Sequence, residues 1–452
     1  MTRFALAAML LAAPAAGAAA QGLRVPHTSF TLPNGLQVLV HEDRSVPIVT
    51  VNTWYRVGSG DEVAGRTGFA HLFEHLMFMG SQHVPTGAFD QMLEAAGANN
   101  NGSTTEDRTN YYETGPANAA ELMLYLDADR MGYLLPEITA EKLDLQRGVV
   151  QNERRQRVDN QPYGLAEENI LSRLFPPGHP YSWPVIGSLA DLQAASIEDV
   201  RNFFRQWYTP NNATVVIAGA ITPAEARTLV ERWFGDIPRG PEPQRNTPAP
   251  VRLERNQSHV LEDRVQLPRV YNAWHTVPAY SNDDAALQVL SGILAGGRSS
   301  RLYRKLVYEM QIATQVAAYH DGLKMAGSWR LFATARPGHN LDELQRVIDE
   351  QIRLLADSGP TQREVERVQN QTESGFLSQM ETVLGKADQM NQYLYFVGTA
   401  DWFQQDLDRF RRVTPADVQR VARQYIAGQN RVVLSVVPQG QRNLAVSEGA
   451  VP

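Results

Sequence analysis

Two histidines and a glutamate lie close together in the stretch from Gly68 to Gly80, which reads GFAHLFEHLMFMG. His71 and His75 are four residues apart, so on a helix they lie one turn above each other and can direct their ring nitrogens at one ion. Glu74 falls beside them on the same face. Two neutral imidazoles and one more carboxylate leave a fourth position open for water, as a catalytic zinc requires. The spacing therefore predicts a Zn²⁺ site, with Glu74 as the general base that takes a proton from water.

A third metal ligand has to come from elsewhere in the chain. The sequence contains no cysteine, so the ligand must be a histidine or a carboxylate. Glu121, Glu141 and Glu153 all fall in segments with helical periodicity, and each could equally belong to a solvated helix face. Spacing alone does not choose among these three glutamates.

Composition restricts the class of protein that these residues can serve. Of the 452 residues, 43% are hydrophobic and 20% are charged, which is typical of a folded protein. A chain of this length is too long for a single hydrophobic core. The formal net charge is -7, and no run of Lys and Arg is interleaved with aromatic residues. We therefore expect a protein of more than one domain that has no nucleic-acid partner.

The N-terminus has the pattern of an export signal. Arg3 is followed by an apolar stretch over residues 4–16 and by three alanines, Ala18 to Ala20, before Gln21. A spanning helix needs about 20 apolar residues, so this stretch is too short for one, and no other segment reaches that length. We expect a signal peptide over residues 1–20, no membrane span, and a periplasmic location, which also suits an exported chain without disulfides.

Strands and helices alternate in a way that favours an α+β fold built twice. Strands are expected at residues 36–41 and 48–55, and helices at 68–79, 117–134 and 140–157. A helix opening at Ser196 and a β-branched strand at 213–218 resemble a later helix opening at Thr414 and a strand at 431–437. The pattern predicts an internal duplication, that is, two tandem homologous α/β sandwich domains.

A proline-rich stretch, IPRGPEPQRNTPAP, begins at Ile237 between the two similar halves and has no apolar periodicity. It predicts a linker. The expected division is a signal peptide at 1–20, an N-terminal zinc domain at 21–236, the linker at 237–258, a second and inactive repeat at 259–440, and a tail at 441–452.

With its other motifs, the chain resembles the pitrilysin/insulysin family of inverted-motif zinc peptidases, in a subgroup like the bacterial processing peptidases. The resemblance rests on the HxxEH stretch, on TLPNGLQVLV from Thr31, on GSGDE from Gly58 and on GANNNGST from Gly97. It implies a zinc endopeptidase of short or unfolded peptides, shaped as half of a clamshell that closes on a second chain.

The resemblance also assigns further site residues. It implies Glu153 as the third ligand, in the phrase RGVVQNER, and places Gln146 where the family usually has a glutamate that supports the zinc ligands. An amide can still hydrogen-bond, but it supplies no charge. The stretch Asn101, Gly102, Ser103 and Thr104 matches the edge strand to which an extended peptide substrate adds.

A third implication of the resemblance concerns the partner chain. In the family, a second-half segment resembling LREKxGLxY supplies an Arg and a Tyr that hold the substrate near the zinc. Val307 and Thr314 stand at those positions here, and neither can replace the missing donors. We therefore expect a heterodimer with a zinc-less paralogue that supplies the Arg/Tyr pair. The alternative is a homodimer that uses Arg301, Arg304 or Tyr308.

Two other functions remain open at the level of sequence. One is a non-catalytic assembly or binding subunit of a peptidase complex, which the intact HxxEH motif disfavours. The other is a zinc hydrolase of another amide substrate, which the expected peptide-adding strand and the repeated architecture disfavour.

Overall fold

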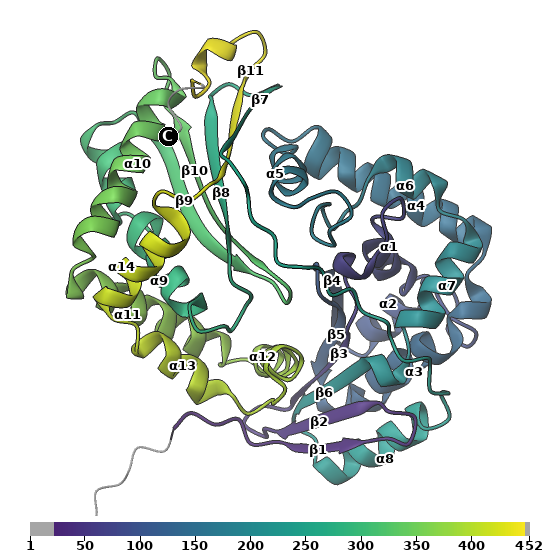
Figure 1. Ribbon diagram of the computed structural model, residues 1–452. Coiled ribbons are helices and arrows are strands. Elements are labelled where there is room, and N and C mark those ends of the chain that lie inside the picture. The colour runs from purple at the N-terminus through teal and green to yellow at the C-terminus, as the bar shows by residue number, and fades with distance from the viewer. Residues whose placement is uncertain (1–21, 448–452) are drawn as a thin grey trace, which may run out of the picture.

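The computed structural model describes residues 22–447 and has two lobes, each made of one β-sheet with helices packed on it (Figure 1). The predicted signal peptide and the last five residues of the predicted tail lie outside the described residues. Among the described residues, no helix is long and apolar enough to cross a membrane.

The first lobe contains a six-stranded sheet in the order β1-β2-β6-β3-β5-β4. Its strands are β1 (Thr28–Thr31), β2 (Gln37–Glu42), β3 (Ile48–Tyr55), β4 (Asn99–Thr104), β5 (Thr109–Pro116) and β6 (Ala213–Gly219). Its helices are α1 (Phe69–Leu76), α2 (Ala88–Ala95), α3 (Ala120–Tyr133), α4 (Ala140–Arg154), α5 (Ala166–Leu174), α6 (Leu189–Ala194), α7 (Ile197–Trp207) and α8 (Pro223–Phe234). The predicted strands and helices of this half are present, with ends that shift by a few residues.

The second lobe contains a five-stranded sheet in the order β7-β11-β8-β10-β9. Its strands are β7 (Gln257–Asp263), β8 (Arg269–Thr276), β9 (Ala313–Gly322), β10 (Gly327–Ala335) and β11 (Val432–Pro438). Its helices are α9 (Asp284–Ala295), α10 (Leu341–Ser358), α11 (Gln362–Gln379), α12 (Val383–Val397), α13 (Phe403–Arg411) and α14 (Pro415–Val421).

The two sheets have the same topology once β1 is set aside. Strands β2 to β6 are ordered 2-6-3-5-4, and β7 to β11 are ordered 7-11-8-10-9, so each strand has a counterpart five places later. The one parallel pair, β2 with β6, corresponds to the parallel pair of β7 with β11. The two helices that suggested a duplication, α7 and α14, both begin with a capping box, at Ser196 and at Thr414. The prediction of a repeated α/β architecture is confirmed.

Each lobe also lends a helix to the sheet of the other. Helix α12 of the second lobe packs on β3 and β6 of the first, and α5 of the first lobe packs on β8 and β11 of the second. Figure 1 shows α12 next to the first sheet and α5 next to the second. Apolar residues of α12, including Met390, form one core cluster with Leu39 and Val216, and Ile170 of α5 forms another with Leu434. The lobes therefore share two apolar cores.

The proline-rich segment after α8 contains no helix or strand until β7 begins at Gln257. It is nevertheless held against the first lobe, because Arg245 donates a 2.8 Å hydrogen bond to Asn212 and forms an ion pair of 3.3 Å with Asp61. Its irregular backbone fits the predicted linker, and the domain boundaries stay a prediction.

Candidate metal centre

Helix α1 carries the HxxEH motif and presents one face to the protein core. Its apolar residues Leu72, Phe73 and Leu76 are buried in the main cluster of the first lobe. The three-and-four spacing then leaves His71, Glu74 and His75 half-buried on the opposite side. The helix begins after Gly68, which has a φ of 87° and offers no side-chain cap.

Glu153 of α4 meets the two histidines of α1. Its Oε2 atom lies 3.6 Å from Nε2 of His71 and 3.3 Å from Nε2 of His75. One ligand atom from each of the three residues lies within 4.8 Å of the other two. The second carboxylate oxygen pairs with Arg157, one turn further along the chain. The structure thus brings together the three residues that were predicted to bind metal.

The geometry and protonation of these residues fit a zinc ion. Two ligands of a tetrahedral zinc, each about 2.1 Å from the metal, lie about 3.4 Å apart, close to the two nitrogen–oxygen separations here. Burial, reinforced by the neighbouring His75, lowers the pKa of His71 to about 4, so its imidazole is neutral and can donate a lone pair. Nδ1 of His71 is buried and has no hydrogen-bond partner among the described residues, so Nε2 is the atom that faces the other ligands.

Glu74 lies beside this cluster and touches the edge strand β4. The hydroxyl of Thr104 donates a 2.7 Å hydrogen bond to Oε2 of Glu74. A Cβ atom on Gly102 would lie 3.1 Å from Cγ of Glu74, so the absence of a side chain at Gly102 lets the glutamate lie against the strand. Burial raises the pKa of Glu74, and the Thr104 hydrogen bond opposes that rise.

Strand β4 contains the predicted substrate-binding residues Asn101 to Thr104, and it forms the edge of its sheet because it pairs only with β5. Arg108 at the β4–β5 turn holds the hairpin together by donating to the backbone oxygen of Ser103 at 2.8 Å and to its hydroxyl at 2.6 Å. Among the described residues, β4 therefore has no partner strand on its outer side, where the N–H of Gly102 donates to the side-chain oxygen of Asn101 at 2.8 Å.

The other candidate residues lie elsewhere. Glu121 pairs with Arg232 at 2.7 Å, and Glu141 lies in the first turn of α4, about 18 Å along the helix axis from Glu153. Gln146 is nearly buried, and its amide donates to the sulfur of Met79 just beyond α1. It therefore links α4 to the segment that follows the motif helix.

The second-lobe segment that aligns with the family's Arg/Tyr pair offers no free donor at Val307 or Thr314. Val307 packs partly buried against the core of the second lobe, and the hydroxyl of Thr314 donates to the backbone oxygen of Thr334 at 3.3 Å. Among the alternatives, Arg301 is held by Glu364 at 2.7 Å, while Tyr308 is 75% exposed. The side chain of Arg304 is 64% exposed, so Arg304 and Tyr308, and not Arg301, are the side chains among these alternatives that can reach another chain.

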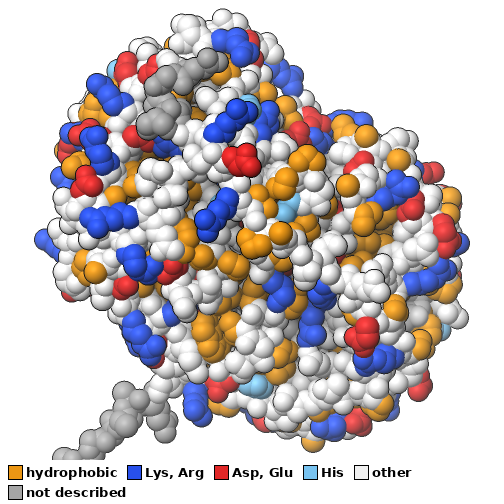
Figure 2. All heavy atoms as spheres, viewed as in Figure 1, with side chains coloured by type: hydrophobic (Ala, Val, Ile, Leu, Met, Phe, Trp, Pro, Cys, Tyr) orange, Lys and Arg blue, Asp and Glu red, His pale blue; other side chains and the backbone are white. Residues whose placement is uncertain are grey.

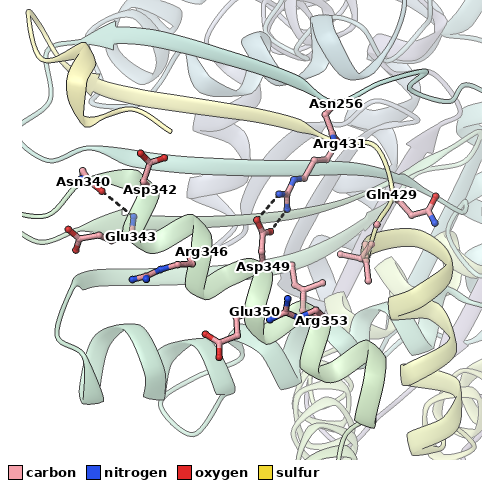
Figure 3. A pocket seen from close by; sticks show the side chains of 14 residues that line it. Asn256, Asn340, Asp342, Glu343, Arg346, Asp349, Glu350, Arg353, Gln429 and Arg431 are labelled. Carbon is pink, nitrogen blue, oxygen red and sulfur yellow. Dashed lines mark hydrogen bonds and ion pairs between the residues drawn. The ribbon is translucent and has the colours of Figure 1, made fainter. Parts of the chain in front are cut away.

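A cavity of about 1100 Å³ lies away from the histidines, between α10 and the loop before β11 (Figure 3). Arg431 and Asp349 form a two-point ion pair in its wall, and Arg346, Glu350 and Arg353 add charges of both signs. Its walls contain no histidine. The candidate metal site is therefore identified by its ligand atoms and not by this cavity.

Figure 2 shows positive and negative side chains interspersed over the visible face of the protein.

Comparison with known proteins assigns the family. A sequence profile described as "Insulinase (Peptidase family M16)" matches residues 37–180, and one described as "Peptidase M16 inactive domain" matches residues 194–372. Together they cover most of both lobes. The chain belongs to peptidase family M16. The predicted resemblance to the pitrilysin/insulysin peptidases is thus confirmed. The match described as inactive spans the end of the first lobe and much of the second.

Relatives within M16 match along nearly the whole chain. A protein of Helicobacter pylori named zinc protease PqqE is 29% identical over 443 residues, which cover 96% of this chain and 98% of that protein. A probable mitochondrial-processing peptidase subunit beta of Arabidopsis thaliana is 25% identical over 92% of this chain and 79% of its own. These names support an M16-type peptidase.

Solved structures show the same fold. The crystal structure of a protease from Helicobacter pylori has a TM-score of 0.86 and 27% identity, and covers 92% of this chain and 100% of that one. A Pseudomonas fluorescens structure, titled as a peptidase M16 inactive domain, has a TM-score of 0.82 at 18% identity, and covers 93% and 99%. The two-lobed arrangement is therefore that of M16 proteins.

Two contacts at this site carry no signal in the sequence. The hydrogen bond from Thr104 to Glu74 depends on how β4 packs against α1, which local patterns do not specify. Glu62 accepts hydrogen bonds from the backbone N–H groups of Gly68 at 3.0 Å and Ala70 at 2.8 Å, so it caps α1 from outside the helix. Burial raises the pKa of Glu62 to about 8, although these two hydrogen bonds act to lower it. Glu62 stands in the GSGDE phrase, whose spacing alone does not indicate a cap.

Proposed function

We propose that this M16 protein is a zinc-dependent endopeptidase that hydrolyses short or unfolded peptides, with His71, His75 and Glu153 as zinc ligands and Glu74 as general base. The observation that carries the proposal is the convergence of these side chains from two helices, with ligand atoms within 4.8 Å and Glu74 beside them. A zinc ion bound there supplies Lewis acidity, which polarises a peptide carbonyl and acidifies water.

The protein's own groups complete the reaction. Glu74 accepts the proton of the attacking water and later delivers it to the leaving amine. Its half-buried position and raised pKa suit this exchange, because a base works best when its pKa lies near the operating pH. Thr104 fixes the direction of the carboxylate through its hydrogen bond.

The open edge of β4 supports a peptide substrate over another amide. An extended peptide can add to this edge by backbone hydrogen bonds, and Asn101, Gly102, Ser103 and Thr104 then lie next to it. Because Gly102 lies against Glu74, a peptide on this strand passes the proposed base. Short or unfolded peptides can adopt the extended form that such an edge binds, so they are the expected substrates.

We also propose that the active form is a heterodimer with a zinc-less paralogue in the periplasm. The support is the second-lobe segment, in which Val307 is partly buried against the core and Thr314 hydrogen-bonds to its own sheet. The paralogue then supplies the Arg/Tyr pair. A homodimer that uses Arg301, Arg304 or Tyr308 is the alternative, and of these Arg304 and Tyr308 are exposed.

The proposed activity is tested by cleavage of an unstructured peptide by mature protein that contains zinc, alone and with the paralogue. Glu74→Gln should keep the metal and lose turnover. Glu225→Gln, on the distant helix α8, serves as the matched control and should leave turnover unchanged. Zinc binding without cleavage of any peptide, with or without the paralogue, would favour a non-catalytic subunit, and cleavage of non-peptide amides alone would favour the other hydrolase.

A further inference from the structure

One short segment, residues 183–195, contacts both helices that carry the proposed zinc ligands; we call it the bridging segment. It runs from Trp183 through Gly187 and includes α6. The two M16 profile matches leave residues 181–193 uncovered, so most of the bridging segment lies outside them. It contributes none of the three proposed ligands itself.

The bridging segment holds the start of α1 by hydrogen bonds. Asp191 accepts from the backbone N–H of Thr67 at 3.0 Å and from its hydroxyl at 2.6 Å, and the Thr67 hydroxyl in turn accepts from Ser188 N at 3.0 Å. The indole N–H of Trp183 donates to Glu62 at 3.1 Å, on the carboxyl group that caps α1. His71 lies only four residues after Thr67, so these bonds act within about one turn of the metal.

A contact between two glycines sets how closely the bridging segment approaches α1. Gly68 and Gly187 both have left-handed backbones, with φ of 87° and 70°. A Cβ atom on Gly187 would lie 2.4 Å from the backbone nitrogen of Gly68 and 2.5 Å from its Cα. Distances this short are not tolerated, so any side chain at Gly187 pushes the two backbones apart.

The same segment accepts hydrogen bonds from α4, which carries Glu153. Arg154 donates to the backbone oxygen of Gly187 at 2.9 Å, and Arg147 donates to the backbone oxygens of Leu192 at 2.9 Å and Ala195 at 2.6 Å. Arg154 directly follows Glu153 in the chain. Gly187 therefore touches α1 through its α-carbon and α4 through its carbonyl oxygen.

We propose that the bridging segment is a positioning element that fixes the separation between the histidine pair on α1 and Glu153 on α4. This inference rests on the proposed zinc site and adds a role for residues that touch neither metal nor substrate. A ligand set drawn from two helices binds tightly only when their spacing is fixed beforehand, and partners outside the ligand shell typically change metal affinity by about 10–100-fold.

The test compares Gly187→Ala with Gly178→Ala in the full mature chain. Gly178 also has a left-handed backbone, with φ of 85°, but a Cβ there meets nothing within 4 Å, so it matches the strain without the contact. Zinc affinity is measured by competition with a chromophoric chelator. Amide hydrogen exchange of α1 and α4 is measured in the metal-free protein.

We expect Gly187→Ala to weaken zinc binding by about 10–100-fold and to speed amide exchange in α1, while Gly178→Ala changes neither. Equal zinc affinity and equal α1 exchange in the two variants would overturn the proposal. If the wild-type protein binds no zinc, the proposed function fails. The amide exchange of α1 and α4 then tests by itself whether the bridging segment holds the two helices in place. If Gly187→Ala does not fold, Thr67→Val replaces it in the test, because it removes the hydroxyl shared with Asp191 and Ser188. Thr67→Val is expected to weaken zinc binding and to speed amide exchange in α1 in the same way. Unchanged zinc affinity and α1 exchange in Thr67→Val would overturn the proposal.

Discussion

The hydroxyl of Thr104 donates a 2.7 Å hydrogen bond to the carboxylate of Glu74, so the edge strand is joined directly to the proposed base. Substrate binding on β4 and proton transfer by Glu74 are therefore linked through one side chain. A peptide that adds to the strand is placed by the same backbone that orients the base.

Thr104→Val should lower kcat by about 2–10-fold, because a single hydrogen bond of this kind contributes about 0.5–1.5 kcal/mol. Valine keeps the shape of threonine and removes the donor. Thr104→Ser keeps the donor and should retain most of the activity. Steady-state cleavage of an unstructured peptide checks this, and a Thr104→Val enzyme with unchanged kcat would show that the contact does not orient Glu74.

Mixing with the zinc-less paralogue should raise peptidase turnover by on the order of 10²–10³-fold over this chain alone, since one donor to a developing oxyanion is worth that much. Replacing the paralogue's arginine should abolish the gain. Full turnover by the isolated chain, lost in Tyr308→Phe, would instead support the homodimer that uses the exposed Tyr308.

Asp284 should stabilise the second lobe in a pH-dependent way. Burial alone would raise its pKa, but a hydrogen bond from His320 at 2.9 Å and the charge of Arg409 hold the pKa well below the usual value. A carboxylate with a depressed folded pKa stabilises the fold above its unfolded pKa of about 3.9, and this stabilisation is lost as the pH falls.

Asp284→Asn should therefore lower the free energy of unfolding by about 3 kcal/mol at pH 7, because it leaves the half-buried Arg409 without one of its partners. The difference from wild type should shrink by about 1 kcal/mol between pH 5 and pH 3. Denaturant unfolding at these pH values checks both numbers. A difference that does not change with pH would show that the carboxylate charge has no part in the effect.

The two lobes should stay together after the proline-rich segment is cut. Helix α12 is tied to the first lobe by Asp388, which accepts a 3.2 Å hydrogen bond from the indole of Trp54, and by Lys386, which lies 2.7 Å from Asp43. A protease site inserted near Gly240 allows the cut. Size-exclusion chromatography should show one particle of unchanged size, and separation into two fragments at neutral pH would contradict the shared cores.

The sequence predicted the parts of the site that depend on local spacing. The four-residue interval of His71 and His75 specifies one face of a helix whatever surrounds it, so the motif could be found without a structure. Glu153 could be chosen over Glu121 and Glu141 only through the family resemblance, because the approach of α4 to α1 is a matter of tertiary packing. The bridging segment and the hydrogen bond from Thr104 had no local signal for the same reason.

In the fold, too, the features that depend on local sequence were predicted and those that depend on tertiary packing were not. Strand β3 was predicted at its observed ends, since all of its eight residues except Asn52 are β-branched or aromatic. The exchange of α5 and α12 between lobes was not predicted, because an apolar helix face does not specify which sheet covers it. The proline-rich segment was expected only to connect the lobes, and its anchoring by Arg245 emerged from the structure.

Zinc content of the purified mature protein and its variants tests the central claim most directly. The wild type should bind about one zinc per chain, and His71→Ala and His75→Ala should lose it. Glu153→Gln should weaken zinc binding far more than the matched change Glu141→Gln on the same helix, and Glu74→Gln should keep the metal. Equal effects of Glu153→Gln and Glu141→Gln, or loss of zinc in Glu74→Gln, would contradict the proposed site.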